Sequence, residues 1–251
     1  MRVLLPPSET KRDGGAATPV NLDQLSFAEL TPTRRNLIDA VVALAQDEVT
    51  CRSALKLGPK LAFEVARNRM IRSAPTLPAI DRYTGVLFDA LSAGTLSVTA
   101  RAQVLANVYI QSALWGPLGA GDAIPAYRLS CTSTLPALAR SVTATWVEAS
   151  RDLHGLWDGF VLDARSEGYA DMTPVPASAN AHFLRVATRD SGGATRALNH
   201  FNKKAKGEFV RALAESHAIA DITSPAHLCE WGVAHGWHIE ITADGEIMLL
   251  V

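Results

Sequence analysis

Three lysines stand where a predicted strand passes into a predicted helix, and this placement is typical of a phosphate site. Residues 199–207 run Asn-His-Phe-Asn-Lys-Lys-Ala-Lys-Gly. Lysines beside the positive end of a helix dipole are electrostatically unfavourable unless an anion accompanies them. We therefore predict that Lys203, Lys204 and Lys206 bind phosphate. Solvated lysines at a helix entry would give the same pattern, and the spacing alone leaves both interpretations open.

A second basic cluster lies in residues 50–71, which predict two short helices joined at Gly58-Pro59. Glycine suits the end of one helix, and proline suits the first turn of the next. This pattern indicates a helix-hairpin-helix element, in which Gly58 lets the backbone approach a phosphate. Lys56 and Lys60 would add attraction that does not depend on nucleic-acid sequence. An ordinary helical hairpin with solvated lysines fits the same residues.

The N-terminal turn is a third candidate, because it follows a short apolar strand at residues 3–5. Ligands of α/β proteins bind beside the carboxyl ends of strands. Ser8, Thr10 and Lys11 are therefore candidate phosphate ligands. The turn lacks the glycines of a GxxxxGKS loop, so it carries no nucleotide fingerprint. A simple strand-ending turn is the alternative.

Three further groups combine hydroxyl, phenol and charged side chains beside predicted strands or turns, as ligand sites do. Ordinary turn chemistry and surface ion pairs are the alternative explanation, and they are favoured for each group taken singly. The binding candidates in these groups are Tyr83, Thr84, Arg128 and Ser166, and the candidate catalytic acids or bases are Tyr127, Glu167 and Tyr169.

Charge balance requires any nucleic-acid surface to be local. The 251 residues carry 24 Lys and Arg against 25 Asp and Glu, which gives a net charge of -1. A chain with this balance has no global attraction to phosphate. We therefore expect a basic cleft that binds DNA without sequence preference.

The remaining composition predicts a cytoplasmic protein without a metal or a cofactor. Cys51, Cys131 and Cys229 are odd in number and far apart, which indicates a reducing compartment and neither a disulfide framework nor a zinc site. The apolar start ends by Ser8, too early for a secretory signal. No stretch has the roughly twenty apolar residues of a membrane span. We expect a monomer.

Periodicity predicts a mixed α/β fold in a single domain covering residues 1–251. Strands are expected at 3–5, 108–110, 160–163 and 182–187, with a closing hairpin at 237–251. Helices are expected from Pro32 with Thr31 or Thr33 as N-cap, at 86–91 and 100–107, from about 135 to 156, and from about 203 to 217. Residues 115–121 are expected to interrupt this order. We predict a mixed sheet flanked by helices.

The same segments resemble the YaaA family of peroxide stress proteins, in order along nearly the whole chain. Tyr83-Thr84-Gly85 is similar to that family's Tyr-Thr-Gly, and Lys203–Gly207 is similar to its Lys-Lys-Ala-Arg-Gly. Further resemblance lies in Pro7–Lys11, Ser112–Leu118, Pro125–Leu129 and Ser166–Tyr169.

The resemblance implies a mixed α/β fold with a helix-hairpin-helix element, DNA binding in a basic cleft, and a role in limiting free iron and DNA damage during peroxide stress. An enzyme acting on a nucleotide, nucleobase or nucleic acid in the same cleft is the competing hypothesis. In that case Lys203, Lys204 and Arg128 would hold phosphate or stabilise negative charge.

Overall fold

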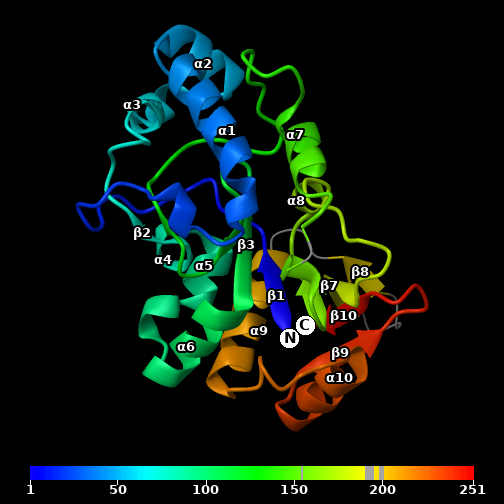
Figure 1. The fold of residues 1–251 in the computed structure, drawn as a ribbon. Coiled ribbons are helices and arrows are strands. Elements are labelled where there is room, and N and C mark those ends of the chain that lie inside the picture. The colour runs from blue at the N-terminus through cyan, green and yellow to red at the C-terminus, as the bar shows by residue number, and fades with distance from the viewer. Residues whose placement is uncertain (154, 190–194, 198–200) are drawn as a thin grey trace.

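The fold is built on a mixed sheet of eight strands (Figure 1). The computed structural model describes residues 1–153, 155–189, 195–197 and 201–251. The sheet order is β4-β3-β1-β6-β7-β10-β9, and β8 pairs with β7 outside this path. The strands are β1 (Arg2–Leu5), β3 (Val108–Ser112), β4 (Gly116–Gly119), β6 (Val161–Asp163), β7 (Ala181–Arg189), β8 (Thr195–Ala197), β9 (His238–Ile241) and β10 (Ile247–Leu250). The predicted α/β class and mixed sheet are confirmed.

The centre of the sheet is parallel, as its apolar strands require. Strands β3, β1, β6, β7 and β10 run parallel, whereas β4 and β9 are antiparallel at the edges. Val3, Leu5, Val161 and Leu162 are fully buried, which is typical of strands covered on both faces. From β1 the chain first forms β3 on one side and later β6 on the other. The carboxyl ends of β1 and β6 therefore meet where the strand order reverses, the usual place for a ligand.

Helices pack around the sheet, and the position of the longest one, α9 (Phe201–Glu215), depends on a glycine. A Cβ on Gly207 would collide with the carbonyl oxygen of Leu87 and would come within 2.9 Å of the Ala90 Cβ. Only glycine therefore lets α9 approach α5 (Val86–Leu91) so closely. The other helices are α1 (Thr31–Leu44), α2 (Glu48–Ala54), α3 (Phe63–Arg69), α4 (Ala79–Arg82), α6 (Val98–Asn107), α7 (Val142–Ala149), α8 (Glu167–Ala170) and α10 (Pro225–Ala234).

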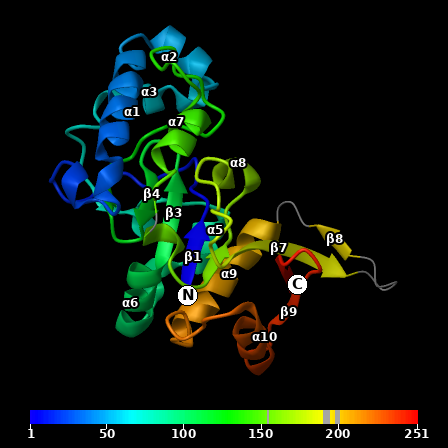
Figure 2. The ribbon, with the colours of Figure 1, turned by 45° about the vertical axis from the view of Figure 1, so that its right-hand side comes forward.

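Helices α2 and α3 form the predicted helix pair, and both views place this pair at the end of the molecule away from α9 (Figures 1 and 2). A short 3-10 helix, Pro59–Leu61, separates them, with Gly58 as its N-cap. The connection is therefore longer than the direct junction that we predicted. Leu55 and Leu57 are buried, whereas Lys56, Gly58 and Lys60 are exposed. We call residues 56–60 the hairpin tip; its binding of phosphate stays a prediction.

A buried arginine fixes the N-terminal loop that follows β1. The Arg82 guanidinium donates hydrogen bonds to the carbonyl oxygens of Arg12, Gly14, Pro75 and Ile124. Burial lowers the pKa of this group to about 10, so it still carries its charge at neutral pH. Four carbonyl acceptors compensate much of the cost of burying that charge. Arg82 therefore joins the loop to α4 and to the chain around residue 124.

The sequence predictions differ from the structure in four segments. The helix expected from 135 to 156 is only α7, Val142–Ala149, with Ser141 as its cap. Residues 116–119 form β4, an edge strand, where Pro117 is tolerated because an edge can dispense with one donor. Helix α10 was not predicted. In α1, Leu30 stands at the N-cap and Thr31 lies inside the helix.

The predicted elements elsewhere occur where the pattern placed them. Strands β1, β3, β6 and β7, the hairpin of β9 and β10, and helices α1, α5, α6 and α9 match their predictions within a few residues. No helix in the described part of the chain has the length and apolar character needed to cross a membrane. The single-domain boundary at 1–251 stays a prediction. Two short strands, β2 (Leu77–Pro78) and β5 (Ala123–Ile124), form a separate small sheet.

Candidate functional site

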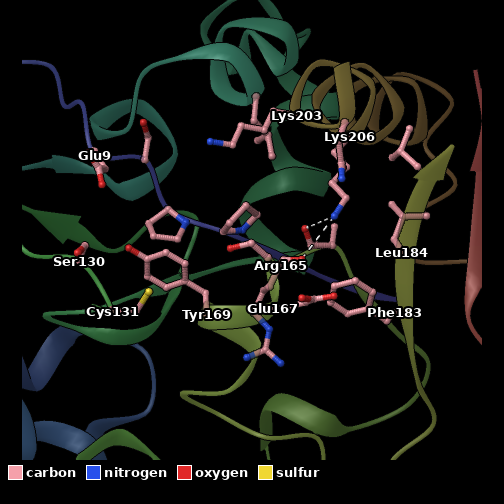
Figure 3. Close-up of a pocket in the computed structure, with 18 of the residues that line it drawn as sticks. Glu9, Ser130, Cys131, Arg165, Glu167, Tyr169, Phe183, Leu184, Lys203 and Lys206 are labelled. Carbon is pink, nitrogen blue, oxygen red and sulfur yellow. Dashed lines mark hydrogen bonds between the residues drawn. The ribbon is translucent and has the colours of Figure 1, made fainter. Parts of the chain in front are cut away.

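A pocket of about 680 Å³ lies at the carboxyl ends of β1 and β6, between β7 and the start of α9 (Figure 3). The turn after β1 forms one wall, and residues 183–186 of β7 form another. Its charged lining residues are four cations, Arg165, Arg185, Lys203 and Lys206, and two carboxylates, Glu9 and Glu167. The pocket is therefore locally cationic in a chain whose net charge is -1. Its size suits a ligand of nucleotide dimensions.

Lys206 extends from α9 to the chain that leaves β6. Its Nζ donates hydrogen bonds to the carbonyl oxygens of Ala164, at 3.0 Å, and Arg165, at 3.4 Å (Figure 3). The residue is only 5% exposed, and burial lowers its pKa to about 8. Lys206 therefore holds the pocket wall in place and carries most of its positive charge at neutral pH.

Lys203 and Lys204 lie one residue apart but face different surroundings. Lys203 lines the pocket, and its exposed side chain has no ion pair with a described residue. Lys204 forms an ion pair with Glu208 at 3.3 Å and does not line the pocket. The two lysines are equivalent in the sequence pattern. Only Lys203 is placed to meet a ligand in the pocket.

A buried ion pair between Arg165 and Asp163 lies at the end of β6, next to the pocket. Arg165 donates from Nε to Asp163 Oδ1 at 2.9 Å and from one terminal nitrogen to Asp163 Oδ2 at 2.7 Å. The side chains of both residues are almost completely buried. Another terminal nitrogen of Arg165 donates to the carbonyl oxygen of Thr173 at 3.0 Å. This bidentate pair fixes the segment that carries Ser166, Glu167 and Tyr169 into the pocket.

The phenol of Tyr169 lies beside Cys131 in the lining of the pocket (Figure 3). Burial strongly raises the pKa of Tyr169, so its hydroxyl keeps its proton at physiological pH. Burial likewise raises the pKa of the Cys131 thiol. The exposed Glu167 carboxylate forms an ion pair with Arg185 at 3.3 Å. The phenol and the thiol can donate hydrogen bonds to a ligand and the Glu167 carboxylate can accept them, but the thiol is not an activated nucleophile.

The turn after β1 is held by hydroxyl contacts against residues 84 and 85, which precede α5. The Thr10 hydroxyl donates to the carbonyl oxygen of Thr84 at 3.3 Å, and the Ser8 and Thr10 hydroxyls are 3.2 Å apart. Gly85, with φ of +98°, packs against these hydroxyls, and a Cβ there would come within 3.2 Å of the Ser8 Oγ. Glu9 forms an ion pair with Arg128 at the rim. Ser8, Glu9 and Thr10 thus reach the pocket from a fixed backbone.

Lys11 lies beneath that turn, in a separate buried cluster. Its Nζ donates to the Ser8 carbonyl oxygen at 2.9 Å and lies 4.1 Å from the centre of the Tyr127 ring. Burial lowers the pKa of Lys11 to about 7. The Tyr127 hydroxyl lies 2.8 Å from the Tyr83 hydroxyl and 2.7 Å from Ser112 Oγ. Lys11 and these hydroxyls support the turn from inside and do not line the pocket.

Comparison with known proteins identifies relatives along nearly the full chain. A family model described as peroxide stress protein YaaA matches residues 1–240. The chain belongs to the YaaA family. A UPF0246 protein of Corynebacterium efficiens is 42% identical over 245 residues, covering 96% of this chain and 95% of the relative. A UPF0246 protein of Streptomyces coelicolor is 34% identical over 254 residues, covering 98% and 94%.

The structure brings together about half of the site residues predicted for this YaaA family chain. Three of the predicted residues form the buried cluster instead: Tyr83, Tyr127 and Lys11. Two others, Thr84 and Arg128, contact the turn after β1. The hairpin tip contains Lys56, Gly58 and Lys60, and Lys204 pairs with Glu208 outside the pocket. The predicted residues that line the pocket are Ser8, Thr10, Ser166, Glu167, Tyr169, Lys203 and Lys206.

Several pocket residues of this YaaA family chain were not predicted as site residues. Phe183, Leu184 and Val186 occur in an apolar strand, where the sequence pattern indicates only a core position. Ser130 and Cys131 lie outside any regular element and carry no motif. A repeated placement of polar groups after predicted strand ends is the one signal that pointed to this edge. Ser8 and Ser166, which both follow predicted strands, line this pocket together.

Proposed function

We propose that this YaaA family chain binds a nucleotide in the pocket between β1, β6 and β7, with the phosphate at Lys203 and the first turn of α9. The observation that carries the proposal is the excess of cations around a nucleotide-sized pocket at the reversal of strand order. A phosphate at this point would accept hydrogen bonds from the ammonium and from helix N–H groups. Its charge would also offset the repulsion between Lys203 and the helix dipole.

The hydroxyl groups of the pocket support the same ligand class. Ser8, Thr10 and Ser166 line the pocket, and sugar or phosphate oxygens are natural partners for such hydroxyls. Apolar surface from Pro6, Leu87 and Phe183 would cover the rest of the ligand. A few polar groups on a mostly apolar wall are the usual composition of a small-molecule site.

Calorimetric titration with AMP, ADP and ribose 5-phosphate tests this proposal. Lys203→Ala is expected to weaken binding about tenfold or more, since hydrogen bonds to charged groups contribute about 1.5–3 kcal/mol. Lys204→Ala is the matched control, because Lys204 lies on the same helical turn and pairs with Glu208 outside the pocket. Its affinity should stay within about twofold of the wild-type value. Equal effects of the two substitutions, or no binding at millimolar ligand, would overturn the proposal.

The same pocket also contains two groups that could serve catalysis, an acid and a base. The protonated Tyr169 would act as an acid or hydrogen-bond donor, and the exposed Glu167 would act as a base. Tyr127 is a poor candidate, because it is fully buried among Ser112 and Tyr83. Incubation with nucleotides followed by chromatography tests turnover, with Glu167→Gln as the diagnostic variant.

We propose as a second function that the chain binds DNA through the hairpin tip. The specific observation is that Lys56, Gly58 and Lys60 are all exposed on a turn anchored by the buried Leu55 and Leu57. A rigid turn with two exposed ammonium groups suits sequence-independent contact with a phosphate backbone. By covering DNA, the chain would limit DNA damage during peroxide stress, and we propose that any effect on free iron is indirect.

Mobility-shift titration at low salt tests the DNA proposal. Lys56→Ala and Lys60→Ala together should weaken binding to all duplex sequences alike, because phosphate contacts carry no sequence information. The Lys203→Ala variant should leave DNA affinity unchanged. A complete absence of complexes at low salt would exclude the second function without affecting the first. Free-iron assays in peroxide-treated cells that lack the chain would test the cellular role.

A further inference from the structure

The pocket carries a carboxylate that a phosphate site does not need. Glu167 lines the pocket, and its side chain is 76% exposed. Glu167 belongs to α8, whereas Lys203 belongs to α9, so the two opposite charges reach the pocket from different elements (Figure 3). A carboxylate repels a phosphate at short range. A phosphate at Lys203 therefore leaves Glu167 to meet an uncharged part of the ligand.

Glu167 is held in place through its backbone and its side chain. Its carbonyl oxygen accepts a hydrogen bond from the Asp171 N–H at 2.9 Å. Its Oε1 accepts from a terminal nitrogen of Arg185 at 3.3 Å. Arg185 is itself fixed, because its other two nitrogens donate to the two carboxylate oxygens of Glu246. The Glu167 carboxylate thus keeps a set position while its side chain stays largely open to solvent.

The other carboxylate of the pocket, Glu9, has a different setting. Its Oε2 accepts from Arg128 at 2.5 Å, and the side chain of Arg128 is only 12% exposed. Arg128 does not line the pocket, so this ion pair holds Glu9 at the rim. Glu167 pairs instead with Arg185, which is a lining residue. Glu167 is therefore the carboxylate that is better placed for a ligand.

Hydroxyl groups accompany this carboxylate on α8. Ser166 stands at the N-cap of α8 and lines the pocket, and its hydroxyl makes no capping hydrogen bond to this helix. Tyr169 lines the pocket with a phenol that keeps its proton. A carboxylate only accepts hydrogen bonds, whereas these hydroxyls also donate them. A ligand group that both donates and accepts at neighbouring atoms is therefore the natural complement of α8.

The 2′ and 3′ hydroxyls of a ribose have this chemistry. Each hydroxyl donates one hydrogen bond and accepts others, and the two groups lie on adjacent carbons on the same side of the ring. One carboxylate can accept from both, and such charge-assisted hydrogen bonds are stronger than neutral ones. In dinucleotide-binding α/β folds an acidic side chain accepts from a ribose hydroxyl.

The lining also distinguishes a sugar from a base by exposure. Leu87 and Leu184 are buried apolar lining residues, whereas Ser166 and Glu167 are exposed polar ones. Burial stabilises the apolar faces of a base, whereas sugar hydroxyls keep contact with water. This division favours a ribose at Glu167 over the N–H edge of guanine, which offers a similar pair of donors.

We propose that Glu167 accepts hydrogen bonds from the 2′ and 3′ hydroxyls of a ribonucleotide, so that the pocket selects free ribonucleotides over deoxyribonucleotides. This inference rests on the proposed nucleotide function and adds the class of sugar. DNA lacks the 2′ hydroxyl, so the pocket would not serve the DNA binding proposed for the hairpin tip. A carboxylate that accepts from a hydroxyl can also remove its proton, so this role is compatible with Glu167 as a base.

Calorimetric titration of the wild-type protein with sugar analogues tests the inference. AMP should bind about tenfold or more tightly than 2′-deoxy-AMP or 3′-deoxy-AMP, because each analogue removes one hydrogen bond to a charged acceptor. The arabinose analogue of AMP carries its 2′ hydroxyl on the other side of the ring and should also lose about tenfold. Ribose 5-phosphate should bind more tightly than 2-deoxyribose 5-phosphate.

Substitution of Glu167 makes the assignment specific. Glu167→Ala should bring the affinities for AMP and 2′-deoxy-AMP within about twofold of each other, and an exposed side chain can be removed with little effect on folding. Glu208→Ala is the matched control, because the Glu208 ion pair with Lys204 has the same length of 3.3 Å and lies outside the pocket. This control should keep the full preference for ribose.

The outcomes separate this inference from the proposed function. Equal affinities for AMP and its deoxy analogues, with Lys203→Ala still weakening both, would overturn the ribose contact and keep the phosphate site. A preference for ribose that survives Glu167→Ala, or a preference for GMP over AMP that this substitution removes, would overturn the role of Glu167. Binding of adenosine as tightly as AMP, with the ribose preference intact, would overturn the role of Lys203 alone. Failure of every nucleotide and nucleoside to bind would overturn both.

Discussion

The pocket and the hairpin tip both present lysines beside a helix start, yet the two sets of lysines differ in burial. In the pocket, Lys206 is 5% exposed and holds two carbonyl oxygens. At the hairpin tip, Lys56 and Lys60 are exposed to solvent. Burial turns a lysine into a fixed part of a wall, whereas exposure leaves it free to follow a flexible polyanion. The first arrangement suits a small ligand, and the second suits a phosphate backbone.

The largest expected difference between the regions concerns their ion pairs. Asp163→Asn should lower the free energy of unfolding by about 3–5 kcal/mol, because it leaves the buried Arg165 without its counter-charge. The control is Glu48→Gln in α2, whose carboxylate lies 3.9 Å from Arg52 in a partly exposed pair. That change should cost less than about 0.5 kcal/mol. Urea unfolding followed by circular dichroism measures both, and similar losses would remove the distinction between a rigid and a solvated region.

A smaller difference is expected for the two glycines. Gly207→Ala should destabilise the protein by about 1–3 kcal/mol, because the new methyl group must displace α9 from α5. A Cβ at Gly58 would meet no atom within 4 Å, so Gly58→Ala should change stability by less than about 0.5 kcal/mol. Thermal unfolding of both variants makes the comparison. If Gly58→Ala proved the more damaging, the hairpin tip would need a conformation that only glycine allows.

Stability should rise with pH because of the buried lysines. Burial lowers the pKa of Lys11 from an ordinary value of 10.5 to about 7 in the folded state. The nearby Glu64 carboxylate opposes this shift, and the Arg128 guanidinium adds to it. Above pH 7 the unfolded chain therefore binds more protons than the folded chain, so the free energy of unfolding increases. Lys11→Met should reduce this increase between pH 7 and 9, whereas Lys56→Met should leave it unchanged. Chemical denaturation at several pH values measures the slope, and identical slopes for both variants would contradict the burial argument.

The smallest expected effect lies in the salt dependence of DNA binding. Replacing both Lys56 and Lys60 by alanine should reduce the slope of log K against log salt by about 2, because each phosphate contact releases roughly one counterion. Lys203→Ala should leave the slope unchanged. Binding curves at several salt concentrations supply the values. If Lys203→Ala alone reduced this slope, DNA would contact the pocket, and the pocket and the hairpin tip would form one DNA-binding surface.

The sequence determined most of the regular elements, since their signals are local. Apolar runs defined β1 and β6, and helical spacing defined α1 and α9. Where local signals conflict with tertiary packing, prediction failed. Pro117 was taken as a break, although an edge strand accepts a proline. The helix expected from 135 to 156 shortened to α7, because much of that segment packs as irregular chain.

The identity of the site was decided by tertiary structure. Lys203 and Lys204 are neighbours in one basic motif, but helix geometry directs only Lys203 to the pocket. Lys56 belongs to an equally basic motif, yet it lies between α2 and α3, which the fold holds at the end of the molecule away from α9 (Figure 2). Sequence fixes which groups are charged or apolar, and strand register and helix packing determine which of them share a cavity.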